Sequence, residues 1–191
     1  FQDAANRRIM IAWVREARSK EAVLKAGWSG LLSVPRILSL GSDQTLKVRP
    51  IPEIETLRAG LKSASNIPLL SGASEPLAGV NGDALDIEAE FEPGDSTRFG
   101  LKVLASPDGR EETTIYYDRQ TSRLMMDSTR SSLSSEVSKE VIGDVVQSSS
   151  AKAFRLRILV DRSIVEAFTG DGAAITGRVY PTLSTSRNVR A

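Results

Sequence analysis

The feature that most constrains the fold of this chain is an alternating apolar stretch over residues 154–168. Its first part alternates apolar side chains with arginines, in the order Phe154, Arg155, Leu156, Arg157 and Ile158. A period of two is typical of a half-buried β-strand. Polar residues at 161–163 interrupt the stretch before it resumes at 164–168, which predicts two antiparallel strands joined by a tight turn. A second turn at 169–172 leads into a third strand at 173–180, so we predict an antiparallel meander.

Short alternating segments also fill the chain from residue 83 onward. We predict strands at 85–91, 99–105, 113–118 and 123–127, and the start of one more at 189–191. Turn signals separate them, and the strongest is Pro107-Asp108-Gly109. The serine-rich segments, 128–138 and 148–150, are predicted to be solvated loops. Many short strands at regular spacing indicate a β-sandwich over 83–191.

The first fifty residues predict a smaller antiparallel sheet. Strands are predicted at 7–14, 31–40 and 45–48, and Pro35 marks an edge or a bulge in the second of them. Residues 15–25 are predicted to be an exposed loop or a short helix. A group of three antiparallel strands has about the size of one propeller blade.

Residues 51–82 are predicted to connect the two sheets. A switch to helical spacing predicts a short helix over 53–61, and residues 62–82, rich in Ser, Pro and Gly, form a crossover. The apolar residues on one face of this helix are Ile54, Leu57 and Leu61. The predicted fold class is therefore all-β: one antiparallel propeller-blade-like sheet, a short connecting helix, and then an antiparallel β-sandwich.

Composition excludes several classes of site. The 191 residues contain no histidine and no cysteine, which removes Ser-His-Asp triads, zinc–imidazole sites and cysteine nucleophiles. Gly170-Asp171-Gly172 lacks the further ligands that calcium needs and is interpreted as a turn, so no metal and no cofactor are expected. The net charge of +1, with scattered basic residues, predicts neither a nucleic-acid nor a membrane partner. The first residues, Phe1-Gln2-Asp3-Ala4, have no signal-peptide layout and are interpreted as a start within a longer protein.

Five blocks of sequence carry a resemblance to a known family. They are Arg-Arg-Ile-Met-Ile-Ala-Trp-Val (7–14), Gly-Trp-Ser-Gly-Leu-Leu-Ser-Val-Pro-Arg (27–36), Pro-Glu-Ile-Glu-Thr-Leu-Arg (52–58), Leu-Val-Asp-Arg-Ser-Ile-Val-Glu-Ala-Phe (159–168) and Gly-Arg-Val-Tyr-Pro (177–181). In order and spacing they resemble glycoside hydrolase family 32, which includes invertases, inulinases and levanases. The resemblance implies three units: residues 1–50 are the last blade of a five-bladed β-propeller, 51–82 a helix and linker, and 83–191 the C-terminal β-sandwich.

The resemblance also implies an activity, the hydrolysis of terminal β-D-fructofuranosides in sucrose or fructans with retention. The family's aspartate nucleophile, glutamate acid/base and second aspartate lie in Asn-Asp-Pro, Glu-Cys and Arg-Asp-Pro blocks on earlier blades, and this sequence contains none of these blocks. Retaining hydrolysis needs two carboxyl groups about 5–5.5 Å apart. We therefore assign no catalytic residue to this chain and expect it to be inactive alone, as the C-terminal portion of a β-fructofuranosidase. Its family is found in cytoplasmic, vacuolar and secreted forms, so no single compartment is implied.

The expected partners are the substrate, the remaining propeller blades in the same or a separate chain, and further copies of this chain. Alone, the first fifty residues would expose apolar strands, so we expect them to self-associate, to pack on the sandwich or to pair with the other blades. The alternative is a non-catalytic β-sandwich with a structural, oligomerisation or carbohydrate-binding role. Its few aromatic residues favour the structural role, because several are expected in the core.

Two tryptophans are the candidate substrate-binding residues. The resemblance implies that Trp13 lines the pocket for the terminal fructose, since an indole face suits the C–H side of a sugar; packing between blades is an equal alternative. Trp28 could line the pocket rim, although packing against a neighbouring element is favoured. Arg36 is expected to form an ion pair or to bind backbone carbonyls.

A polar set at 161–166 could suggest acid–base chemistry. Asp161 and Ser163 lie in a predicted turn, which favours capping of backbone N–H groups instead. Glu166 lies in a strand and is expected to have a structural role. The arginines expected to pair with it are Arg155, Arg157 and Arg162.

Overall fold

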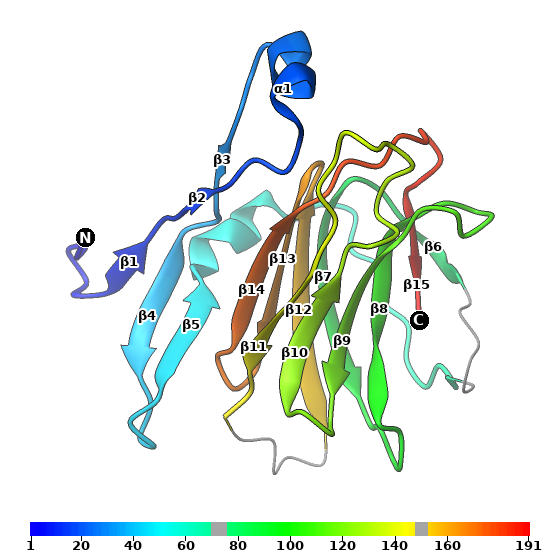
Figure 1. Ribbon diagram of the computed structural model, residues 1–191. Coiled ribbons are helices and arrows are strands. Elements are labelled where there is room, and N and C mark those ends of the chain that lie inside the picture. Colours follow the sequence, from blue (N-terminus) through cyan, green and yellow to red (C-terminus); the bar gives the residue numbers. More distant parts are fainter. Residues whose placement is uncertain (70–75, 148–152) are drawn as a thin grey trace.

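The computed structural model describes residues 1–69, 76–147 and 153–191, which form four antiparallel sheets (Figure 1). A small N-terminal sheet stands beside a two-layer sandwich built from the rest of the chain (Figure 1). The described residues contain two short helices, α1 (Lys20–Ala26) and the 3₁₀ helix η1 (Pro52–Leu57). Neither of them is long and apolar enough to span a membrane. The predicted all-β class is confirmed.

The N-terminal part contains two separate antiparallel pairings. Its main sheet has the order β1-β4-β5, and β2 pairs with β3. The bounds are β1 (Arg8–Met10), β2 (Trp13–Val14), β3 (Leu31–Leu32), β4 (Arg36–Leu40) and β5 (Leu46–Pro50). The predicted strands 7–14 and 31–40 are thus each divided in two. Between the halves, Ser33 donates its N–H to the Ala12 carbonyl at 2.8 Å and accepts the Ala12 N–H on Oγ at 3.0 Å.

Helix α1 lies between β2 and β3, within the segment predicted as loop or short helix. Ser19 caps its N-terminus by accepting the Ala22 N–H on Oγ at 3.1 Å. Gly27 ends the helix in the left-handed conformation, with φ of +74°. No residue of α1 is buried, and Figure 1 shows the helix projecting beyond the sheets. Local capping rather than burial therefore defines this helix.

The connecting helix is shorter than predicted. It ends at Leu57, so the prediction of a helix over 53–61 is wrong in its second half. Leu57 and Leu61 are 81% and 93% exposed, and a single short turn is not stable without burial of its apolar face. Arg58 closes η1 by donating its N–H to the Glu55 carbonyl at 3.1 Å.

The sandwich consists of a six-stranded and a four-stranded sheet. Their orders are β11-β10-β9-β8-β15-β6 and β14-β13-β12-β7. The bounds are β6 (Pro76–Asn81), β7 (Ala84–Phe91), β8 (Arg98–Ala105), β9 (Thr113–Asp118), β10 (Arg123–Asp127), β11 (Val141–Val145), β12 (Phe154–Asp161), β13 (Ile164–Thr169), β14 (Ala174–Arg178) and β15 (Asn188–Arg190). The predicted strands are all present, and the meander is β12-β13-β14. Two strands were not predicted: β6 lies within the supposed crossover, and β11 follows the serine-rich loop.

The core lies between these two sheets, where the inward side chains of both meet. An aromatic cluster crosses the interface, with Phe91 and Phe154 from the four-stranded sheet against Phe99 and Tyr117 from the six-stranded one. The Tyr117 and Phe154 rings stack with centroids 4.5 Å apart, and Phe99 meets Phe154 edge-on at 5.3 Å. Full burial of each such side chain contributes about 2–3 kcal/mol. The alternation along β12 thus reflects one face in the core and one outside it.

Strand β13 differs from β12 because all six of its residues are buried. Val165 and Ala167 face the core between the sheets. The other face carries Glu166 and Phe168, and the N-terminal sheet covers it: the Val48 N–H of β5 bonds to the Gly172 carbonyl at 3.0 Å. The first fifty residues therefore pack on the sandwich, which is one of the three predicted outcomes.

A buried ion pair joins the N-terminal sheet to β13. Arg36 of β4 is 7% exposed and donates Nη2 to the Glu166 carboxylate, whose residue is 3% exposed. Glu166 Oε1 also accepts the Val34 N–H at 2.7 Å, and the Arg36 Nη2 donates to Thr176 Oγ1. The ion pair predicted for Arg36 is confirmed. The predicted partners of Glu166 are wrong, since Arg155 and Arg157 instead pair with carboxylates of β7, Glu90 and Asp86.

A second buried carboxylate holds the loops at one end of the sandwich. Glu111 is fully buried and accepts five hydrogen bonds. The donors are the N–H groups of Leu133, Thr182 and Leu183 and the hydroxyls of Thr182 and Ser186. Burial works against its charge, but these hydrogen bonds, led by the Ser186 and Thr182 hydroxyls, lower the pKa of Glu111 to about 2.

The serine-rich loop 128–138 is only partly solvated, contrary to the prediction. Its buried serines are Ser128, Ser131 and Ser132. Ser128 bonds to both backbone groups of Glu140, which attaches the loop to the start of β11. The other serine-rich segment, 148–150, lies outside the described residues.

Breaking the buried pair should destabilise the chain far more than breaking an exposed pair. We expect Arg36→Met to lower the free energy of unfolding by about 3–5 kcal/mol, because it leaves the Glu166 charge buried without its cation. The matched control is Arg155→Met, whose exposed pair with Glu90 should cost less than about 1 kcal/mol. Urea unfolding followed by circular dichroism measures both. Equal costs for the two variants would contradict this assignment.

Glu111 should make stability depend on acid pH. Its folded pKa of about 2 lies below the ordinary value of 4.5, so its contribution is complete above pH 4.5 and is lost as the pH falls through 2. We expect Glu111→Gln to cost about 3 kcal/mol at pH 7, with a difference from wild type that shrinks on acidification. Urea unfolding between pH 2 and 7 tests this, with the exposed Glu92→Gln as control. A difference that stays constant with pH would exclude the charge as the cause.

Candidate functional site

Trp13, the first candidate, lies in β2 with its side chain largely exposed, at 66%. Its indole rests on Gly30, so close that a Cβ at that position would lie 2.2 Å from Trp13 Cζ2. Gly30 also has φ of +72°, a conformation that favours glycine. Gly30 thus packs directly against the indole, and the rest of the ring is exposed.

Trp28, the second candidate, packs against two arginines of this chain. The Arg18 Cζ lies 4.2 Å from the centroid of its ring, and the Arg178 Cζ lies 5.5 Å away. Arg18 also donates to the Trp28 carbonyl at 2.9 Å. Arg178 belongs to β14, so Trp28 packs between the sandwich and the hairpin formed by β2, α1 and β3. Among the described residues no ring contact joins the two indoles.

Glu16 lies at the centre of this hairpin, and no sequence pattern indicated its role. Its carboxylate accepts from Arg18 at 2.9 Å, from the Tyr180 hydroxyl at 2.5 Å and from the Gly30 N–H at 3.4 Å. Burial opposes the charge, but the hydrogen bonds from Arg18 and Tyr180 hold the pKa of Glu16 well below its usual range. The carboxylate therefore stays ionised and serves as an anchor for its donors.

Tyr180 brings the sandwich into the same cluster. Its ring lies 4.7 Å from the Arg18 Cζ, so the guanidinium is held between the rings of Trp28 and Tyr180. Burial and then the hydrogen bond to Glu16 raise the pKa of Tyr180 to about 12. Arg178 donates to the same hydroxyl and, at 3.2 Å, to the Ser163 carbonyl. We call the set Glu16, Arg18, Trp28, Arg178 and Tyr180 the hairpin cluster.

The polar set at 161–166 is not brought together. Asp161 is exposed, Ser163 bonds to Arg178, and Glu166 is buried against Arg36. The turn at 170–172 packs against Lys47, since a Cβ on Gly172 would lie 2.8 Å from the Lys47 Cα. No group of acidic side chains suited to a metal ion is found across residues 1–69, 76–147 and 153–191.

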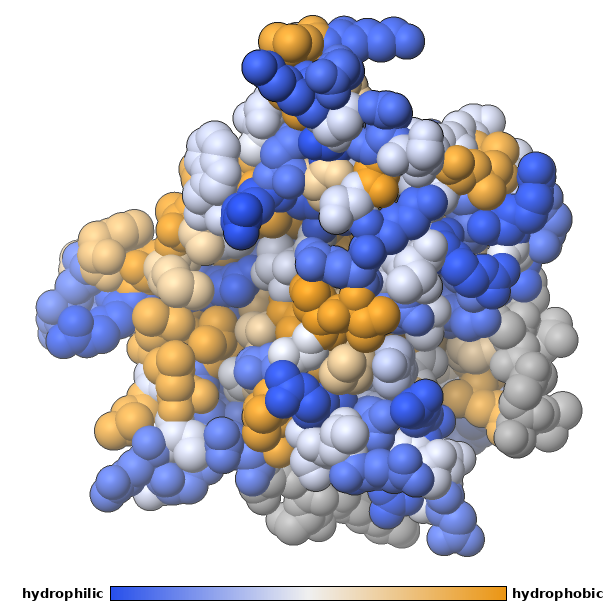
Figure 2. Space-filling view, in the orientation of Figure 1, coloured by the Kyte–Doolittle hydropathy of each residue, from blue (hydrophilic) through white to orange (hydrophobic). Residues whose placement is uncertain are grey.

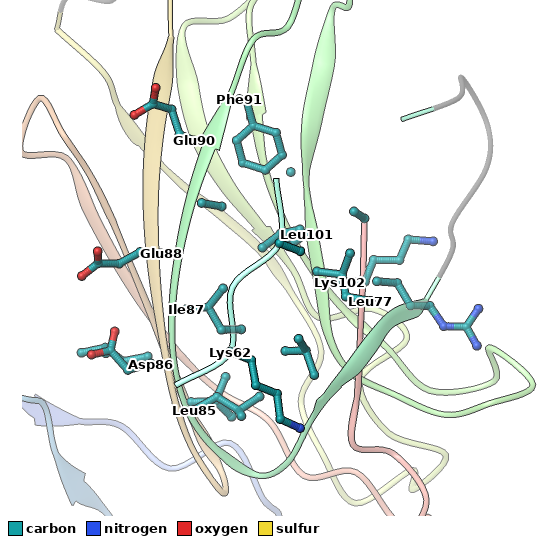
Figure 3. A pocket seen from close by; sticks show the side chains of 18 of the residues that line it. Lys62, Leu77, Leu85, Asp86, Ile87, Glu88, Glu90, Phe91, Leu101 and Lys102 are labelled. Carbon is teal, nitrogen blue, oxygen red and sulfur yellow. The ribbon is translucent and has the colours of Figure 1, made fainter. Parts of the chain in front are cut away.

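A groove opens along β7, where the edges of the two sheets diverge (Figure 3). Figure 3 shows Ile87, Phe91 and Leu101 turned toward the groove, whereas Glu88 and Glu90 point away from it. The segment 58–69 also lines it, and Lys62 crosses it to donate to the Gly79 carbonyl. A sugar site needs several converging polar groups. Charged side chains such as Lys62 and Lys102 line this groove together with apolar ones, but the chain's own segment 58–69 runs along it, so we do not assign it to a ligand.

Exposed apolar side chains gather instead on the N-terminal part. Figure 2 shows them as orange surface at the left of the view, over β1, β4 and β5. The large exposed members on residues 1–50 include Phe1, Ile11, Trp13, Leu32, Leu40 and Leu46. An exposed apolar cluster of this kind is typical of a surface that contacts another molecule.

Comparisons with known proteins place both parts of the chain in one family. The model described as "Glycosyl hydrolases family 32 N-terminal domain" matches residues 1–50, and the model described as "Glycosyl hydrolases family 32 C terminal" matches residues 53–191. A β-fructofuranosidase of Arabidopsis thaliana, insoluble isoenzyme CWINV1, is 32% identical over 98% of this chain and 39% of its own length. A fructan 6-exohydrolase of Triticum aestivum is also 32% identical, over 98% of this chain and 38% of its own length.

Solved structures agree with these matches. Fructan 1-exohydrolase IIa from Cichorium intybus has a TM-score of 0.89 and 26% identity, covering 100% of this chain and 43% of that protein. Sucrose-6-phosphate hydrolase from Lactobacillus gasseri, at 18% identity and a TM-score of 0.68, shares the fold. The chain spans about two fifths of the length of the two curated relatives, 39% and 38%. Since family models match it from residue 1 to 50 and from 53 to 191, the chain belongs to glycoside hydrolase family 32.

Proposed function

We propose that this chain acts as the C-terminal portion of a retaining glycosidase that cleaves β-D-fructofuranosides such as sucrose or fructans. The observation that carries the proposal is the match of a β-fructofuranosidase and a fructan exohydrolase along 98% of the chain. In this assignment residues 1–50 are the last blade of a five-bladed propeller. Residues 51–82 are assigned as helix and linker, except that β6 (76–81) joins the six-stranded sheet and so belongs with residues 83–191 to the sandwich that supports the blade.

The remaining blades, in the same or a separate chain, are the partner that fits the exposed apolar surface of the N-terminal part. One face of the β1-β4-β5 sheet packs on β13, while Leu40 and Leu46 stay 72% and 60% exposed. A propeller blade normally buries such side chains against its neighbour. Self-association of this chain through the same surface is the competing outcome.

The catalytic carboxylates are assigned to those remaining blades. Glu16, Glu111 and Glu166 each accept hydrogen bonds from several donors. A nucleophile and an acid/base must instead face the scissile bond about 5–5.5 Å apart. The structural positions of these three glutamates therefore support a scaffolding role for them.

Trp13 is assigned as a sugar-contact residue of this chain, because its indole is seated on one side and exposed elsewhere. An aromatic face packs well against the C–H groups of a furanose ring. Trp28 is less accessible and is assigned to packing, through its contacts with Arg18 and Arg178. The carbohydrate-binding alternative for the sandwich gains no support, since Phe91, Tyr117 and Phe154 are buried in its core.

We expect the chain alone and the assembled enzyme to differ in hydrolytic activity. The 191-residue chain alone should release no fructose from sucrose or inulin, whereas the enzyme assembled with its remaining blades should do so. In the assembled enzyme, Trp13→Ala should raise KM by about tenfold with little change in kcat, because the ring contact exists in the ground state as well as the transition state.

Fructose release measured by a coupled assay tests both statements, with the exposed Leu24→Ala in α1 as the control variant. Hydrolysis by the chain alone would overturn the assignment of the carboxylates to other blades. An assembled enzyme that cleaves no β-fructofuranoside would overturn the proposed function itself.

A further inference from the structure

We propose that Tyr180 of the sandwich is a positioning residue, which acts through Glu16 to fix the turn on which the Trp13 indole lies. That this indole contacts a sugar rests on the proposed function. The position of the indole itself does not, because it depends only on contacts within this chain.

The Trp13 indole is held in place by its contact with Gly30. Trp13 lies in the two-residue strand β2, and the pairing of β2 with β3, opposite Leu32, positions its backbone but not its exposed side chain. The contact with Gly30 therefore determines where the ring lies. Any movement of the turn that carries Gly30 would move the ring with it.

The turn that carries Gly30 is hydrogen-bonded to Glu16. The Gly30 N–H donates to Glu16 Oε2 at 3.4 Å, and Arg18, bound to the same oxygen at 2.9 Å, donates to the Trp28 carbonyl at 2.9 Å. Both ends of the turn 28–30 are thus attached to one carboxylate, directly or through a guanidinium. The charges strengthen the Arg18 bonds at 2.9 Å, whereas the Gly30 bond at 3.4 Å is longer and weaker.

Glu16 is also hydrogen-bonded to the sandwich, through Tyr180. Tyr180 donates its hydroxyl to Glu16 Oε1 at 2.5 Å, and its ring lies against the Arg18 guanidinium. Arg178, whose side chain is 1% exposed, holds the hydroxyl from the other side. The side of the carboxylate that faces the sandwich therefore has a fixed partner from the segment that follows β14.

The base of the hairpin is attached separately, which allows the two effects to be distinguished. Ser19 donates its N–H to the Glu136 carbonyl at 2.7 Å, and Ser138 donates to the Ala17 carbonyl at 2.6 Å. These backbone bonds attach the hairpin to the sandwich without Tyr180. Loss of the hydroxyl should therefore loosen the turn at 28–30 while the hairpin stays docked.

The test uses Tyr180→Phe, which removes the hydroxyl but keeps the ring against Arg18, together with Glu16→Gln. In the 191-residue chain, the nuclear Overhauser effect between the Trp13 indole Hζ2 and the Gly30 Hα protons should be strong in the wild type and weak in both variants. Trp13→Phe identifies the resonance. The matched control is Tyr116→Phe, a tyrosine of β9 outside the hairpin cluster, which should leave the signal unchanged.

Activity in the assembled enzyme gives the second readout. Tyr180→Phe should raise the KM for sucrose by about fivefold with kcat retained, less than the tenfold of Trp13→Ala, because it displaces the indole without removing it. A Trp13–Gly30 signal that keeps its intensity in both variants would overturn the positioning role. A weakened signal with a KM that Trp13→Ala leaves unchanged would support the positioning role and overturn the sugar contact of the proposed function.

Discussion

The buried pair of Arg36 and Glu166 is the interaction on which the arrangement of this chain depends. It joins residues that are 130 positions apart, one from the N-terminal sheet and one from the central part of the sandwich. Taking both charges out of water is costly, and the cost is offset only when each charge is paired and hydrogen-bonded. Val34 and Thr176 supply the further bonds to the two groups. The two parts can therefore meet in one orientation that leaves neither charge alone.

This docking explains why two neighbouring strands of the four-stranded sheet, β12 and β13, are buried to different extents. β12 alternates over most of its length, because Arg155 and Arg157 on its outer side reach carboxylates of β7 at the surface. β13 is buried on both sides, because β4 and β5 lie over it. The hairpin cluster makes a second junction around Glu16 and Tyr180, where Arg178 lies two residues beyond Thr176 along β14. The sandwich thus supports the N-terminal part at two places and, through the second, the exposed indole.

Much of the fold follows from local patterns in the sequence, whereas the junctions do not. Alternation and turn residues predict most strands, including β12 and β13. The apolar run Ile164, Val165, Ala167 and Phe168 occupies both faces of its strand, a signal of burial on both sides, and a glutamate inside it signals a paired buried charge. Its partner could not be found, because spacing along the chain carries no information about contacts between distant sheets. The helix at 53–61 was overpredicted for a related reason, since Leu57 and Leu61 of its apolar face stay exposed in the described part of the chain.

Hydrogen–deuterium exchange of the backbone amides tests most directly whether the buried pair fixes the N-terminal sheet to the sandwich. We expect the amides of β4 and β5 to exchange as slowly as those of β13 in the wild type, and Arg36→Met to accelerate exchange in β4 and β5 while the six-stranded sheet stays protected. Fast exchange of β4 and β5 in the wild type, with β13 protected, would contradict it. That result would mean that the two parts fold separately and only touch.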